Sequence, residues 1–169
     1  MVNSPQIILS DPPTYPSARD IYLPVITTDY INQVAAFYRL LTADQRQQRP
    51  TLGTSSALEA AAEWKAADIV THGYWQHMAA NGEWPNATAR RFGCNLPVEY
   101  GNGWNGVESL AAGSADAFAI FSALANSPSH RVHLFGENNF YRQQTHMGIA
   151  MVTGGKYGWV WCVLVARCV

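Results

Sequence analysis

The apolar residues in the first two thirds of the chain recur at three- and four-residue steps, the period of an amphipathic helix. A first helix, capped by Thr28 or Asp29, has an apolar face made of Ile31, Val34, Phe37, Tyr38 and Leu41. A capping-box pattern over residues 56–59 then opens a second, alanine-rich helix that runs to Val70. We therefore expect two helices before residue 71.

Two shorter helices are expected next. Pro85 and Gly93 bracket the first of them, because proline suits a first helical turn and glycine suits a helix end. Ser114 can cap the second, which runs to about Ala125, and Pro128 cannot continue it. The side chains expected to face inward on this second helix are Phe118, Phe121, Leu124 and Ala125.

The period changes to two near the C-terminus. Apolar residues alternate over residues 147–152, and the sequence at 153–156 predicts a two-residue hairpin turn. The strand expected over residues 157–166 is apolar on both faces, so it should lie inside a sheet. Helices followed by an antiparallel hairpin indicate an α+β fold.

The N-terminal segment has a different composition. Residues 1–26 contain Pro5, Pro12, Pro13, Pro16 and Pro24. Proline fixes φ and removes a backbone donor, so this segment is expected to be an extended arm or linker. The folded domain is then expected over residues 27–169.

Composition fits one compact domain and excludes two classes of protein. The chain has 169 residues, of which 48% are hydrophobic and 14% charged, enough to build a core. A net charge of −1 without a basic block argues against nucleic-acid binding. No apolar run reaches the length of a membrane span. The N-terminus lacks a signal-peptide pattern, so the chain is either not exported or in its mature form.

Cys94, Cys162 and Cys168 make an odd number of cysteines. In an oxidising compartment, one disulfide and one free thiol are expected, with Cys94 paired to Cys162 or Cys168. Cys168 is preferred because a chain end can move to meet disulfide geometry. The alternative is three unpaired cysteines that pack as small apolar residues.

Candidate chemistry lies in three short stretches, around His77, Glu108 and His130. Gly82 and Gly93 follow His77 by five and sixteen residues, and His130 follows Glu108 by twenty-two. In this register, residues 28–166 resemble the CAP superfamily, which comprises the cysteine-rich secretory, antigen 5 and pathogenesis-related 1 proteins. The resemblance is greatest to the short bacterial SCP-like branch.

The sequence departs from the family pattern at several positions. Val107, Leu124 and His133 stand where the family usually has glycine, tryptophan and asparagine. Ser127 falls near the position of a second glutamate, so the His-His-Glu-Glu tetrad of many eukaryotic members is incomplete here.

The resemblance implies a three-layer α-β-α sandwich with a central antiparallel sheet. It also implies a cleft lined by His77, Glu108 and His130. Two imidazoles and a carboxylate can bind Zn²⁺ or another divalent cation, leaving a fourth position for water. Alternatively, these side chains hydrogen-bond within a polar cleft and hold loops in place. Trp75, Trp84, Tyr100 and Trp104 then line a groove or seal the loops.

Two functions follow as expectations. The first is an extracellular, non-catalytic module whose cleft binds a metal ion, a small molecule, a lipid or a protein. The second is a secreted hydrolase that acts on peptides or cell-wall material, with glutamate and histidine as base and acid. No Gly-x-Ser-x-Gly elbow is present, although Ser127 and Ser129 lie close to His130, and Cys94 would serve as a nucleophile only if exposed. His133 is expected to cover His130.

Overall fold

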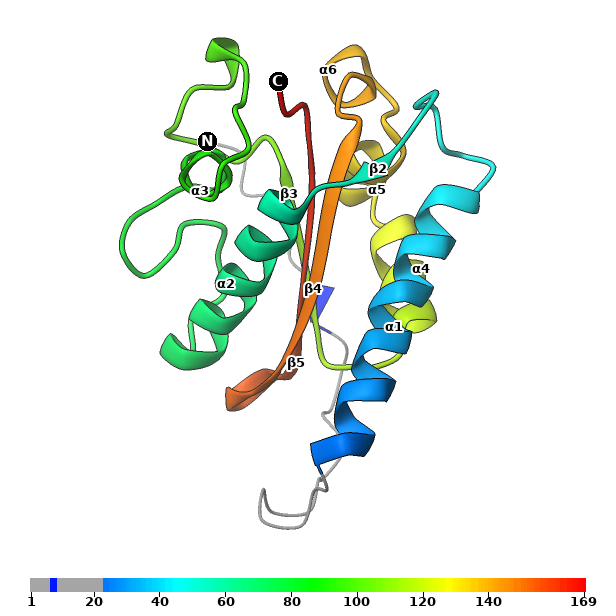
Figure 1. Cartoon of the computed structure of the whole chain (residues 1–169), viewed down its shortest axis with the longest axis vertical. Coiled ribbons are helices and arrows are strands. Elements are labelled where there is room, and N and C mark those ends of the chain that lie inside the picture. The colour runs from blue at the N-terminus through cyan, green and yellow to red at the C-terminus, as the bar shows by residue number, and fades with distance from the viewer. Residues whose placement is uncertain (1–6, 9–22) are drawn as a thin grey trace.

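The computed structural model describes residues 7–8 and 23–169. In this part of the chain, a central sheet separates two helical layers (Figure 1). α2 and α3 pack on one face of the sheet, and α1, α4 and α5 pack on the other. The helices are α1 (Leu23–Ala43), α2 (Ser56–His72), α3 (Pro85–Arg91), α4 (Ala117–Asn126), α5 (Pro128–Phe135) and α6 (Asn139–Arg142). The α+β class and the three-layer sandwich are confirmed.

The sheet has the strand order β1-β3-β5-β4-β2. Its three central strands are antiparallel, whereas the two-residue edge strands run parallel to their neighbours. The strands are β1 (Ile7–Ile8), β2 (Gly53–Thr54), β3 (Glu108–Ala112), β4 (His146–Gly154) and β5 (Gly158–Ala166). The predicted antiparallel centre is therefore present, and the short edges make the sheet mixed.

The predicted C-terminal hairpin is formed by β4 and β5, and β5 lies in the middle of the sheet as expected. The turn differs from the prediction. Gly154 pairs with Gly158, so a 3₁₀ turn over Gly155–Tyr157 joins the strands instead of a two-residue turn. Gly155 has φ +58° and leaves no room for a Cβ, which would lie 2.7 Å from the carbonyl oxygen of Val70.

α2 lies directly against β4. A Cβ on Gly148 would come within 2.1 Å of the backbone carbonyl carbon of Leu58, so the helix backbone touches the strand. The buried face of α2 supports this approach with three small side chains, Ala61, Ala62 and Ala66. This packing fixes α2, whose C-terminal end leads into the loop that carries His77.

The N-terminus of the domain differs from the prediction. α1 begins at Leu23, so Thr28 and Asp29 lie inside the helix and do not cap it. The first turn contains Pro24, where a missing backbone N–H causes no loss. The predicted proline-rich arm, residues 1–26, lies outside the described residues except for β1 and the start of α1.

Two other helix starts are shifted. Ser55, not Ser56, caps α2 by accepting a hydrogen bond from the backbone N–H of Leu58. Asp116 caps α4, and the Ser114 hydroxyl accepts from the N–H of Asp116 instead. Two residues expected in the core face solvent, since Ile31 is 61% exposed and Phe118 is 65% exposed.

Cys94 and Cys168 form a disulfide, and Cys162 is a free, buried thiol. The preferred pairing is therefore confirmed. The disulfide removes Cys94 as a nucleophile and ties the segment after α3 to the chain end, where the N–H of Val169 also donates to the carbonyl of Asn95. None of the helices in the described part of the chain has the length and hydrophobicity that a membrane crossing requires.

Candidate functional site

His77 lies in the loop that follows α2. The helix ends at Gly73, which adopts the left-handed conformation and donates its N–H to the carbonyl of Ile69. Four residues later, the His77 side chain is buried, and its Nδ1 lies 2.8 Å from Oε1 of Glu108. Two of the three residues expected from the sequence are therefore in direct contact.

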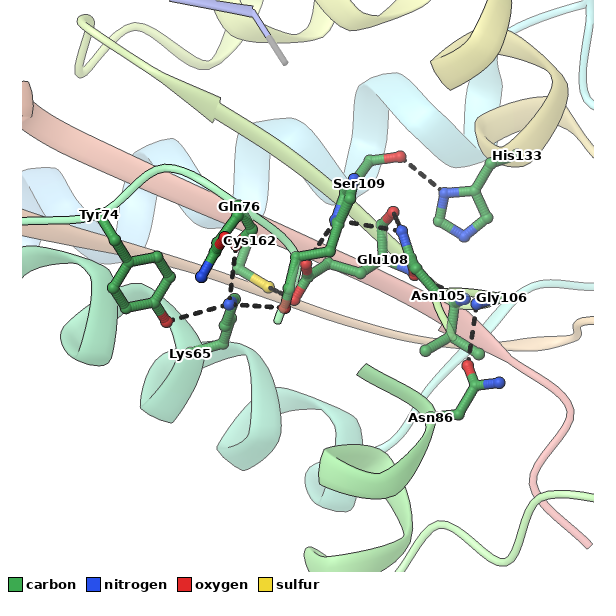
Figure 2. A network of polar contacts seen from close by, with 12 residues as sticks. Lys65, Tyr74, Gln76, Asn86, Asn105, Gly106, Glu108, Ser109, His133 and Cys162 are labelled. Carbon is green, nitrogen blue, oxygen red and sulfur yellow. Dashed lines mark hydrogen bonds and ion pairs between the residues drawn. The ribbon is translucent and has the colours of Figure 1, made fainter. Parts of the chain in front are cut away.

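Glu108 is the first residue of β3, and its carboxylate is almost completely buried. Figure 2 shows its side chain among the polar residues around it. One oxygen contacts His77, and the other accepts a hydrogen bond from the Cys162 thiol at 3.6 Å. The pKa of this thiol is raised by burial and further by Glu108, so the sulfur keeps its proton. Both carboxylate oxygens are thus occupied by neighbours within the protein.

Asn105 holds this arrangement together, although the sequence analysis did not identify it. Its Oδ1 accepts from the backbone N–H groups of Val107 and Glu108, and its amide donates to the carbonyl oxygen of Glu108 at 2.9 Å. The same amide nitrogen lies 3.1 Å from Nδ1 of His77. The Asn-Gly dipeptide formed with Gly106 is a known turn signal and could have revealed it.

His130 lies in the first turn of α5, not after a helix end as the sequence suggested. Pro128 does end α4, but it also opens the next helix, because proline is favoured in a first turn. The Nδ1 of His130 lies 2.8 Å from the hydroxyl oxygen of Ser127. Ser127 therefore contacts the imidazole from the position where many family members are expected to have a second glutamate.

Burial, together with a smaller contribution from His77, lowers the pKa of His130 to about 4. His130 is consequently neutral at physiological pH. Of the three predicted site residues, His77 and Glu108 are in direct contact, while the hydrogen-bond partner of His130 is Ser127.

In both His77 and His130, the second ring nitrogen, Nε2, has a different environment from Nδ1. The Nε2 atoms of His77 and His130 are both buried, and neither has a hydrogen-bond partner among the described residues. Buried polar atoms without a partner are rare in folded proteins, and each one calls for a physical explanation. Both nitrogens belong to neutral or carboxylate-paired imidazoles, which are good ligands for a metal ion.

Nε2 of His77 and Nε2 of His130 are the two atoms of these residues that could hold a metal ion. The Glu108 carboxylate contacts the opposite nitrogen of His77, as carboxylates commonly do behind metal-binding histidines. In this geometry, Glu108 orients His77 and is not free to share an ion with it. Within the described residues, no group of three or more His, Cys, Asp or Glu side chains is placed to hold a metal.

His133 belongs to a neighbouring contact. Its Nδ1 lies 2.7 Å from the Ser109 hydroxyl and its Nε2 lies 3.4 Å from the carbonyl oxygen of Val165. Burial lowers its pKa to about 3, with a further contribution from Arg49. Since Ser109 follows Glu108 in β3, the two side chains point to opposite faces of the sheet. His133 therefore holds α5 against β3.

The loop aromatics divide between burial and the surface. Tyr100 is buried and packs on Phe140, with ring centroids 4.8 Å apart. Trp104 is 40% exposed and packs on the same phenylalanine. Trp75 packs on Tyr157. Tyr100 therefore packs against neighbouring residues and seals the loops.

An open groove of about 760 Å³ lies elsewhere, between α1 and α4. Its apolar lining includes Ala36, Leu40 and Phe121, and its polar lining includes Arg39 and Asp116. None of the three site residues lines this groove.

Two solved structures are similar to this chain. One is an extracellular protein containing an SCP domain from Bacillus anthracis, with a TM-score of 0.65 and 16% identity over 90% of this chain. The other is an outer surface protein from Borrelia burgdorferi, with a TM-score of 0.57 and 18% identity over 85% of this chain. The matches cover 45% and 92% of those proteins, so the chain spans less than half of the Bacillus protein. No family model and no curated protein matches the sequence. The chain thus has an SCP-like fold.

Proposed function

We propose that this chain is an extracellular SCP-like module that binds its ligand through the imidazole groups of His77 and His130. The observation that carries the proposal is the pair of buried Nε2 atoms without hydrogen-bond partners. Leaving two such atoms unpaired is unfavourable, and a ligand that contacts both would remove this penalty. Glu108 orients the His77 ring by contacting its Nδ1 atom.

The disulfide supports an extracellular location. Disulfides such as Cys94–Cys168 form and persist mainly in oxidising compartments, and they are rare in the cytosol. The two structurally similar proteins are an extracellular protein and an outer surface protein, which agrees with this assignment.

A divalent metal, Zn²⁺ in the first place, fits the nitrogen pair best. Imidazole suits zinc, copper and nickel better than calcium or magnesium, which prefer oxygen ligands. A bound zinc ion would supply a Lewis-acidic centre for an anionic group of a small molecule, a lipid or a protein partner. His77 and His130 would hold the ion, and Glu108 would raise the basicity of His77.

A secreted hydrolase for peptides or cell-wall material is the second candidate. The observation that favours it is the Glu108–His77 contact, because a carboxylate-oriented imidazole can act as a general base on water. The serine hydroxyls nearest to histidines are those of Ser127 and Ser109. Their histidines, His130 and His133, have no carboxylate contact among the described residues, which disfavours a serine nucleophile.

Isothermal titration of the purified, metal-free protein with Zn²⁺ tests the first candidate. We expect one site per chain, lost in His77→Ala and in His130→Ala. His146→Ala is the matched control, because His146 begins β4 and is not part of the site. Zinc binding that survives both site variants would refute the proposal. Turnover of peptide or peptidoglycan substrates that depends on Glu108 and His77 would favour the hydrolase instead.

A further inference from the structure

Lys65 occupies an unusual position in α2. It lies on the buried face of the helix with Ala61, Ala62, Ala66 and Ile69, and it is only 2% exposed. Lysine is almost never fully buried unless its ammonium group has partners. Within the described residues, no carboxylate forms an ion pair with Lys65. Something other than a salt bridge must therefore hold this side chain inside.

The ammonium group is satisfied entirely by oxygens of the loop that follows α2 (Figure 2). Lys65 Nζ donates to the Tyr74 hydroxyl at 3.0 Å, to the carbonyl of Gln76 at 3.0 Å and to the carbonyl of His77 at 2.7 Å. These three contacts use all three donors of a lysine ammonium. Two of the acceptors are consecutive carbonyls, and the second belongs to the site residue itself.

A second residue of α2 holds both ends of the same loop. The carboxylate of Asp68 accepts hydrogen bonds from the Tyr74 hydroxyl and, at 3.0 Å, from the backbone N–H of Ala80. Tyr74 thus joins Lys65 to Asp68, and burial together with Asp68 raises the pKa of Tyr74, so the phenol keeps the proton it donates. Lys65, Tyr74 and Asp68, which we name the loop clip, bind residues 74–80 to α2.

The loop clip determines where the His77 ring lies. The backbone carbonyls of Gln76 and His77 are held by Lys65, and α2, which carries Lys65, is fixed by its contact with β4 at Gly148. The Lys65–His77 carbonyl contact is the shortest of the three lysine contacts, and it lies directly at the residue whose Nδ1 must reach Glu108. A displacement of the backbone there would separate the imidazole from the carboxylate.

We infer that Lys65 is a positioning residue, which places His77 against Glu108 and so prepares the Nε2 atom for its ligand. The role of Nε2 in ligand binding rests on the proposed function, whereas the placement of the His77 ring does not. Asp68 and Tyr74 assist by holding the rest of the loop.

Metal-free NMR and hydrogen exchange test the placement. In the wild type, we expect a hydrogen-bonded Nδ1–H resonance of His77 and slow exchange of the backbone amide of Ala80. In Lys65→Met, which keeps the apolar stem, this resonance should disappear, and exchange at Ala80 should speed up at least about tenfold. Leu58→Ala is the control, because it destabilises the same helix without touching the loop and should leave the resonance in place.

Two further variants keep the inference testable if Lys65→Met does not fold. Lys65→Gln retains two N–H donors for the carbonyls, and should preserve part of the His77 signal. Tyr74→Phe removes the hydroxyl that joins Lys65 to Asp68 but keeps both carbonyl contacts of Lys65, so it should loosen Ala80 more than His77. An unchanged His77 resonance and unchanged loop exchange in folded Lys65 variants would overturn the inference and leave Lys65 with a purely structural role.

The ligand experiment is separate from the placement experiment. Zn²⁺ titration of Lys65→Met should show affinity reduced roughly 10- to 100-fold, as expected when a group behind a metal ligand is removed. If the wild type binds no zinc while the NMR results hold, the proposed function fails and the positioning role of Lys65 stands. If zinc binds equally well in wild type and Lys65→Met, Lys65 does not prepare Nε2 for its ligand, and the proposed function stands.

Discussion

His77 and Glu108, thirty-one residues apart in the sequence, form a buried imidazole–carboxylate contact of 2.8 Å between Nδ1 and Oε1. The contact joins the loop after α2 to the first residue of β3. Glu108 engages Nδ1, and the other ring nitrogen of His77, Nε2, has no hydrogen-bond partner among the described residues. The carboxylate therefore orients the His77 ring.

Replacement of this carboxylate should weaken ligand binding without unfolding the protein. In Glu108→Gln, an amide oxygen can still accept a hydrogen bond from Nδ1, but the charge that makes His77 a stronger ligand is lost. Zinc affinity measured by calorimetry should fall about 10- to 100-fold. Glu137→Gln is the control, since Glu137 pairs with Arg131 near the surface. Equal affinities in the two variants would contradict the orienting role.

Acid should destabilise the fold through His133. Its pKa is about 3 in the folded protein and should be about 6.5 in the unfolded chain, so between these values only the unfolded state binds the proton. The free energy of unfolding should therefore fall as pH decreases below about 6.5. At pH 4.5, the loss from this residue should be on the order of 3 kcal/mol. His130, whose pKa is lowered to about 4, adds to this loss of unfolding free energy.

Urea unfolding between pH 4.5 and pH 8 measures this effect. In His133→Gln, the unfolding free energy should depend less on pH, whatever the effect of the substitution at pH 8. Arg49, Tyr141 and Ser109 surround the ring and stay the same in both proteins. An identical pH dependence in wild type and variant would show that His133 does not titrate as the structure indicates.

The contact between α2 and β4 leaves no space at Gly148. In Gly148→Ala, the new methyl group would meet the backbone of Leu58, so either the helix or the strand must move. We expect a loss of about 3 kcal/mol or more in unfolding free energy. Gly53→Ala is the matched control, because a Cβ there meets nothing within 4 Å. Similar losses in both variants would disprove the close approach.

Sequence patterns predicted the parts of the fold that have a strong period. Strand β5 is apolar on both faces, and this pattern is typical of a strand inside a sheet. Strand β3 was not predicted, because glutamate, serine and alanine have little preference for strands and its burial comes from packing between layers. Two-residue strands such as β1 are too short to carry any period.

The sequence predicted that His77 and Glu108 would meet, but not which residues support this contact. His77 and Glu108 were found through their family spacing, and they do meet. The role of Lys65 could not be predicted, because a lysine in a helix normally faces solvent and only the loop carbonyls explain its burial. Pro128 was interpreted as a stop alone, since a proline that ends one helix and opens the next has no separate sequence signal.

Ser127 offers a direct test of how His130 acts. Its hydroxyl contacts Nδ1 of His130 at 2.8 Å, where a carboxylate would make the imidazole a stronger ligand. In Ser127→Asp, the new charge should raise the pKa of His130 above its present value of about 4, because a nearby negative charge favours the imidazolium. Zinc affinity at pH 7 should increase about tenfold or more.

The control for this substitution is Ser129→Asp, which adds the same charge to the first turn of α5 and to its helix dipole. Ser129 contacts the Ser127 hydroxyl at 3.4 Å, whereas the contact to Nδ1 of His130 comes from Ser127. A gain in zinc affinity confined to Ser127→Asp would therefore come from a carboxylate on the imidazole. Equal gains in both variants would mean that general electrostatic attraction, and not orientation of His130, controls binding.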